Sequence, residues 1–150
     1  MEAEVYPNER VVNAISSNFI PAKIHIKEQP QTFKRFGVQW TPTLLVMTPD
    51  GAEAHRIDGF LPIDDLLAQL GLGLGKAMFK QEKFAEAEKR FREVVQSFPS
   101  TEAAPEAAYW AGVSAYKASN DGGKLKETHQ ILQSKYPSSE WARKAMVWGG

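Results

Sequence analysis

The chain has 150 residues with 18 basic and 18 acidic side chains, so no net charge draws it toward nucleic acid or an anionic membrane. A content of 43% hydrophobic and 24% charged residues indicates a soluble globular protein, and no apolar stretch approaches the length of a transmembrane helix. The absence of cysteine excludes disulfides, thiolate nucleophiles and cysteine-bound metals within the chain.

The first part of the chain alternates helix-like and strand-like patterns. Asn8 suits the N-cap of a helix whose apolar residues follow one face as far as Phe19. Residues 20–26 place isoleucine or alanine at every second position, with lysine and histidine between them, which predicts a strand with one polar face. Residues 30–36 predict a short helix that ends at Gly37, with its two phenylalanines facing inward.

A strand–turn–strand pattern follows this helix. Residues 43–47 (Thr-Leu-Leu-Val-Met) predict a short strand that is covered on both faces. Residues 48–51 (Thr-Pro-Asp-Gly) predict a turn, because proline presets one dihedral angle and glycine accepts a positive φ. Residues 52–57 predict the return strand, and Gly59 ends the sheet.

The patterns from Pro62 onward predict helices alone. Pro62 suits the first helical position, and the two aspartates after it favour the positive end of a helix dipole. The next helix has an apolar stripe on one side and a mixed-sign, solvated face on the other. Later helices are predicted from Pro105 through Tyr116, over 125–136, and over 141–148.

Three glycines, at positions 71, 73 and 75, interrupt the first of these helical patterns. Each would weaken the helix by about 1 kcal/mol relative to alanine. They follow no strand, so a phosphate-binding loop is not indicated. We interpret them either as close packing at a domain junction or as a hinge, and we expect Leu66, Leu67 and Leu70 to pack the helices onto the first part of the chain.

The helical part resembles the tetratricopeptide repeat. Phe98-Pro99 and Tyr136-Pro137 are equivalent aromatic–proline stops 38 residues apart. The first unit matches the repeat closely, and the second is looser, with His129 where a large apolar residue is usual. The matching positions of the first unit are Gly75, Met78, Phe84, Ala87, Phe91, Val94 and Pro99. The resemblance, which extends to repeats of bacterial envelope-assembly proteins, implies a protein-binding surface with Tyr109 and Tyr116 as candidate residues.

Residues 36–47, with Asp50-Gly51 and Gly59-Phe60, resemble the C-terminal part of the thioredoxin superfamily. The resemblance implies a cis-proline site at Thr41-Pro42, where the backbone receives an extended peptide and where Trp40 would line the groove. In that family a Cys-x-x-Cys motif lies upstream of the segment that begins here, and one missing strand lies between the strands predicted at 20–26 and 43–47. We therefore interpret the chain as a fragment, or as a gene model started at an internal methionine.

Each candidate functional residue also has a purely structural interpretation. Trp40 is equally explained as a surface residue that covers the end of the sheet, and Thr41 and Pro42 as structural residues. Tyr109 or Trp110 is expected to be buried, since most aromatic residues at helical spacing belong to a core. His25 and His55 are expected to be exposed strand residues, and none of the three histidines has metal-ligand spacing to a second ligand.

The sequence therefore predicts an α/β fold in which an incomplete thioredoxin-like sheet (1–60) precedes an all-α helical-hairpin, tetratricopeptide-like array (61–150). One hypothesis is a redox-family parent that carries out thiol–disulfide exchange, with this chain itself redox-inactive; the other is a non-enzymatic adaptor. We expect protein or peptide partners, no nucleic acid, no cofactor, no metal and no catalytic residue in the chain. Self-association through unpaired strand edges is possible, and the location is cytoplasmic, or periplasmic if an upstream signal is missing.

Overall fold

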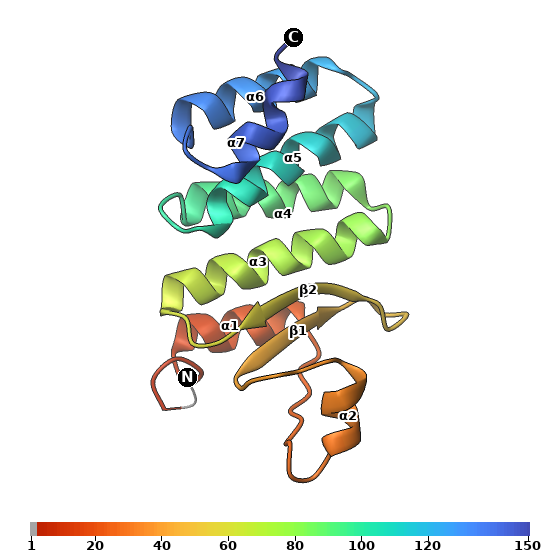
Figure 1. Cartoon of the computed structure of the whole chain (residues 1–150), viewed down its shortest axis with the longest axis vertical. Coiled ribbons are helices and arrows are strands. Elements are labelled where there is room, and N and C mark those ends of the chain that lie inside the picture. The colour runs from red at the N-terminus through yellow and green to blue at the C-terminus, as the bar shows by residue number, and fades with distance from the viewer. Residues whose placement is uncertain (1–2) are drawn as a thin grey trace.

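The computed structural model describes residues 3–150 as a small two-stranded sheet beside a stack of helices (Figure 1). The elements of the first part are helices α1 (Glu9–Asn18) and α2 (Pro30–Arg35) and strands β1 (Thr43–Met47) and β2 (Glu53–Asp58). The helical part comprises α3 (Ile63–Lys80), α4 (Phe84–Ser97), α5 (Ala103–Ser119), α6 (Gly123–Lys135), α7 (Glu140–Lys144) and the 3₁₀ turn η1 (Ala145–Trp148). The predicted order of helices and strands is confirmed everywhere except at residues 20–26.

The N-terminal helix forms as its sequence predicts. The Asn8 side chain accepts a hydrogen bond of 3.0 Å from the backbone N–H of Arg10, and so satisfies one of the free donors at the start of α1. Val11 is fully buried on the inner face. Figure 1 shows that α1 lies beside the sheet and below α3.

Residues 20–26 do not form a strand. They follow α1 as irregular backbone, and Ile20, Ile24 and Ile26 are exposed rather than packed. The alternating pattern is real, but a strand needs a neighbour for its N–H and C=O groups, and in residues 3–150 the only sheet is the pair β1–β2. The prediction was therefore wrong because the pairing partner that the pattern requires is missing.

The sheet is an antiparallel hairpin, as the turn sequence predicts. Thr43 pairs with Asp58 and Leu44 with Ile57, and the register shifts between Val46 and Met47. Gly51 has a φ of 87° in the connecting turn, a conformation that glycine adopts without a steric penalty. Of the strand residues, Val46 and Ile57 are buried and the other residues of β1 are half-buried, so the strand is less covered than the sequence suggests.

A hydrophobic cluster joins the hairpin to the helices. Leu66, Leu67 and Leu70 of α3 are buried with Ile57 of β2 and Val11 of α1, which confirms that α3 packs onto the first part of the chain. A second cluster lies between α3, α4 and α5 around the fully buried Phe91. The sheet and the helical stack therefore share α3 as a common element.

The glycines of α3 mark close packing. A Cβ atom built on Gly73 would lie 2.7 Å from a methyl group of Val46 in β1, and one on Gly71 would lie 2.7 Å from a methyl group of Val94 in α4. Gly75 faces the ring of Phe91 in the same way. Alternate glycines thus bring α3 against the sheet on one side and against α4 on the other, which favours the packing interpretation over a hinge.

The helices after α3 stack in chain order, each beside the one before it (Figure 1). The helix α5 has small buried residues, Ala104, Ala107, Ala111 and Ala115 among them, that let α4 and α6 approach closely. Near the C-terminus, the Ser139 hydroxyl caps α7 by accepting a bond of 3.0 Å from the N–H of Ala142. No helix within residues 3–150 combines the length and the apolar character that crossing a bilayer would require.

Candidate functional site

The loop between α2 and β1 carries the predicted peptide site. The Thr41-Pro42 peptide bond is cis, in the position that the sequence predicts. Trp40 is 63% exposed, Thr41 is exposed and Pro42 is half-buried. Trp40 is therefore a surface residue, available at the end of the strand that follows it.

Hydrogen bonds on three sides hold this loop. The Thr43 hydroxyl lies 2.8 Å from the carbonyl oxygen of Trp40 and 2.9 Å from the Asp58 carboxylate, so it links the loop to β2. The backbone N–H of Gly59 donates a bond of 2.8 Å to the carbonyl of Pro42. The guanidinium of Arg56 donates to the carbonyl of Phe36 and forms a 2.7 Å ion pair with Glu53, which fixes the beginning of the loop against the sheet.

The backbone pattern shows which groups of β1 remain free. In an antiparallel pair, successive residues point their N–H and C=O groups alternately toward and away from the partner strand. The bond from Gly59 to Pro42 shows that the backbone groups of residue 42 point toward β2. By alternation, those of Leu44 also point toward β2, and the N–H and C=O of Thr43 and Leu45 point away from it. Since β1 pairs only with β2 among residues 3–150, this edge offers unpaired donors and acceptors beside Trp40.

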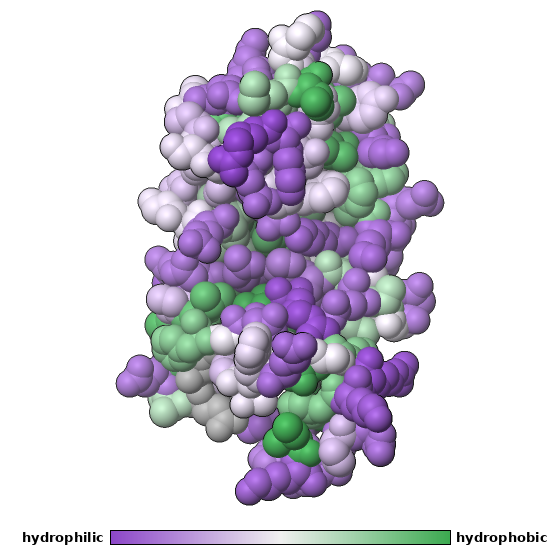
Figure 2. All heavy atoms as spheres, viewed as in Figure 1, coloured by the Kyte–Doolittle hydropathy of each residue, from purple (hydrophilic) through white to green (hydrophobic). Residues whose placement is uncertain are grey.

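Exposed apolar residues gather in the same part of the chain. In Figure 2 most of the visible face is hydrophilic, and green patches interrupt it in the lower part, where Figure 1 places α1, α2 and the hairpin, as well as near the top and along the upper right. The exposed large apolar residues among the first sixty are Val12, Ile20, Ile24, Ile26, Trp40 and Phe60. At the other end of the chain they are Met146 and Val147. An exposed edge with apolar surroundings can bind an extended segment of another protein.

The repeat residues Tyr109 and Tyr116 lie elsewhere, on α5. Tyr109 is half-buried and stacks on Trp148 with ring centroids 4.7 Å apart, while its ring edge meets Trp110 at 5.5 Å. Trp110 is half-buried as well. The prediction that Tyr109 or Trp110 is buried was therefore wrong, because neither is fully buried. Tyr116, also half-buried, lies in the last turn of α5. The structure thus places Tyr109 in an aromatic cluster and does not bring these tyrosines to the Trp40 loop.

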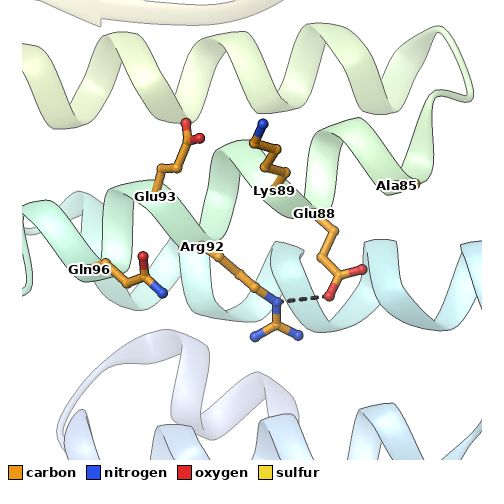
Figure 3. Close-up of a pocket in the computed structure, with 6 residues that line it drawn as sticks. All are labelled: Ala85, Glu88, Lys89, Arg92, Glu93 and Gln96. Atoms are coloured by element: carbon orange, nitrogen blue, oxygen red, sulfur yellow. Dashed lines mark hydrogen bonds and ion pairs between the residues drawn. The ribbon is translucent and has the colours of Figure 1, made fainter.

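The outer face of α4 carries a shallow charged hollow of about 410 Å³ (Figure 3). Glu88 and Arg92 form an ion pair of 2.8 Å there, and Lys89 and Glu93 lie beside them on the same helix. The charges are of mixed sign and the residues come from a single helix, so the face behaves as the solvated surface that the sequence predicts. It offers no convergent set of groups for a ligand.

A polar cluster at the junction of the sheet and the helices was missed by the sequence analysis. His55 of β2 is half-buried, not exposed as expected, and its Nε2 lies 2.7 Å from the Gln69 side-chain oxygen of α3. Burial lowers the pKa of His55, and the bond to Gln69 opposes that effect. His25, the other expected strand histidine, lies in the exposed irregular segment after α1. No group of three or more His, Asp or Glu residues within residues 3–150 is arranged to hold a metal ion.

Comparison with known proteins gives one match. No curated protein and no solved structure matches the chain. Residues 1–73 match the family model of a thioredoxin-like domain, a span that covers α1, α2, the hairpin and the beginning of α3. The N-terminal half of this chain therefore contains a thioredoxin-like domain.

Proposed function

We propose that this chain is a redox-inactive, protein-binding member of the thioredoxin-like group, and that it takes an extended segment of a partner protein along the free edge of β1. The observation that carries the proposal is the outward-facing backbone of Thr43 and Leu45, which lies next to the exposed Trp40. A partner strand would satisfy these backbone groups, and the indole would cover one of its side chains. Disulfide exchange on this chain is excluded because it contains no thiol.

The proposal includes a tetratricopeptide-like arrangement of the helical half, which two repeated features support. Phe98 and Tyr136 end their helices with nearly identical backbone angles, φ −133° and ψ 53° against φ −134° and ψ 50°. Three residues later, Thr101 and Ser139 each donate a side-chain bond to the carbonyl of that aromatic residue, at 2.7 and 2.8 Å. Two hairpins that repeat this geometry would extend the binding surface of the chain, with Tyr109 and Tyr116 as candidate residues.

A displayed library of random peptides, selected on the whole chain, tests the proposal. We expect enrichment of extended, apolar peptides rich in β-branched residues, with binding weakened at least tenfold in Trp40→Ala. Leu45→Pro removes an outward-facing N–H, a substitution that an edge position tolerates, and we expect it to abolish binding. The matched control is Val147→Ala, which alters an even more exposed apolar residue at the far end of the chain. Peptides that bind Trp40→Ala and Leu45→Pro as well as the original chain would contradict the proposal.

The same edge could accept a second copy of the chain instead of a peptide. Sedimentation at increasing protein concentration distinguishes the two, because edge-to-edge pairing gives a dimer that Leu45→Pro prevents. A chain that stays monomeric at concentrations where it binds selected peptides favours a foreign partner.

A second candidate function is thiol–disulfide exchange by a longer parent protein, which the match to a thioredoxin-like domain favours. In that case a Cys-x-x-Cys motif would be encoded in frame before Met1. Reading the DNA upstream of Met1 in the source genome tests this directly. An in-frame strand and cysteine motif would make Thr41 and Pro42 part of an active site, and unrelated sequence there would leave the adaptor role.

A further inference from the structure

Four polar side chains form a continuous line across the junction of the sheet and the helices. Gln69 Oε1 lies 2.7 Å from His55 Nε2, His55 Nδ1 lies 3.4 Å from Lys76 Nζ, and Lys76 Nζ lies 2.6 Å from Glu106 Oε1. The line runs from β2 through α3 to α5.

The chemistry of the line fixes the state of the imidazole. A lysine ammonium donates hydrogen bonds and accepts none, so Nδ1 of His55 must be the unprotonated, accepting nitrogen. The proton of the neutral ring is then on Nε2, where it is donated to the Gln69 oxygen. His55 is thus held as the neutral Nε2–H tautomer between one acceptor and one donor.

Burial and the nearby ammonium of Lys76 on α3 oppose a second proton on His55. Glu106, which lies beyond Lys76 on α5, and Glu53, two residues away on the same strand, favour that proton more weakly. Val46, which pairs with His55 across the ladder, is buried and apolar. The Lys76 and Glu106 side chains are only 23% and 18% exposed, so solvent screens the cluster weakly.

Adding a proton to Nδ1 would place two N–H donors against each other at 3.4 Å and leave two positive charges side by side. The backbone of α3 at Gly73 lies close to His55, since a Cβ built on that glycine would be 3.2 Å from the Cβ of His55. A separation of the hairpin from α3 would relieve the repulsion between the imidazolium and the Lys76 ammonium.

We propose that the Gln69–His55–Lys76–Glu106 line is a proton-sensitive clasp, closed when His55 is neutral, which releases the β1–β2 hairpin from α3 when the solution becomes mildly acidic. The direction of the pH effect follows from the state that can bind the proton. Acidification favours the state in which His55 can take up a proton, which is the open one. For a single proton, the ratio of open to closed molecules rises by at most about tenfold for each unit by which the pH falls.

Nuclear magnetic resonance of the whole chain tests the clasp through the ¹⁵N shifts of the imidazole. At pH 7.5 we expect the His55 shifts of the Nε2–H tautomer, and on titration a midpoint below the usual range for an imidazole. The amide signals of Val46 and Gly73 should move with that same midpoint. The Lys76→Met/Glu106→Gln double variant removes the opposing charge without leaving Glu106 unpaired, and it should raise the midpoint of His55 toward its ordinary range.

A stability measurement completes the test. Between pH 7.5 and pH 5.5 we expect the original chain to lose stability with a slope that is small near pH 7.5 and approaches one proton below the ordinary pKa of an imidazole, and His55→Gln to lose that part of the slope. His25→Gln, at a histidine in the exposed segment after α1, is the matched control and should keep the original slope. An Nδ1–H tautomer at pH 7.5, a His55 midpoint in the ordinary range, or an unchanged slope in His55→Gln would each overturn the proposal.

Discussion

Gly75 of α3 faces the ring of Phe91 in α4, and it offers a sharp test of the packing argument. A Cβ atom at this position would lie 2.5 Å from that ring, which is fully buried. Alanine is a better helix residue than glycine by about 1 kcal/mol, but overpacking a close-packed core costs about 1–3 kcal/mol. We therefore expect Gly75→Ala to destabilise the chain by up to about 2 kcal/mol.

Removing the ring should reverse the sign of this effect. Phe91→Ala alone should cost about 3–5 kcal/mol, because it leaves a cavity in the core between α3, α4 and α5. In that background Gly75→Ala has room for its methyl group, and we expect it to stabilise the chain by up to about 1 kcal/mol. The coupling between the two positions is then about 1–3 kcal/mol.

Urea unfolding of the four chains, followed by tryptophan fluorescence, measures this cycle. Gly122→Ala is the control, because nothing lies within 4 Å of a Cβ built on Gly122 and its φ of −62° suits alanine. It should change the free energy of unfolding by less than about 0.5 kcal/mol. If Gly75→Ala has the same effect with and without the Phe91 ring, the packing argument is wrong.

Three further substitutions test single contacts by the same urea assay. Ser139→Ala removes the side-chain cap of α7 and should cost about 1 kcal/mol, whereas its exposed neighbour Ser138→Ala should cost almost nothing, and equal costs would contradict the cap. Tyr136→Phe deletes the 3.0 Å bond to the carbonyl of Pro99 and should cost about 0.5 kcal/mol, since that bond is solvent-exposed; a gain in stability would show that it contributes nothing. Arg56→Ala frees the Phe36 carbonyl, so the loop before β1 should be cleaved several times faster by protease, and an unchanged rate would show that the loop is held by other contacts.

Local signals in the sequence predicted much of this fold. Asn8 begins a helix because its side chain accepts from the backbone, and Asp50-Gly51 reverses the chain because glycine tolerates positive φ. The aromatic–proline stops at 98–99 and 136–137 end two helices with the same backbone geometry. In each case the information lies within a few residues, so it can be read without knowledge of the rest of the chain.

The site depended on information that the sequence does not hold locally. The free edge of β1 follows from which strands are present, and the apolar pattern at 20–26 wrongly predicted one more. His55 was expected to be exposed, because strand alternation alone does not reveal that Gln69 and Lys76 lie on the helix that covers it. A weak signal was present: Gln69 and Lys76 are seven residues apart, and therefore occupy one face of α3.

The irregular backbone at residues 20–26 and the free edge of β1 have the same physical cause, the lack of a neighbouring strand. An alternating segment becomes a strand only when a neighbour takes up its backbone groups, and β1 keeps an unpaired edge for the same reason. Ile24 and Ile26 stay exposed while Leu45 directs its N–H and C=O away from β2. Any extended segment that pairs with β1 therefore forms backbone hydrogen bonds with Thr43 and Leu45. Its own outer edge is then a strand with which residues 20–26 can pair. The binding of a partner strand to β1 and the ordering of residues 20–26 should accordingly be coupled, and the exposed isoleucines should lose solvent accessibility when a peptide binds.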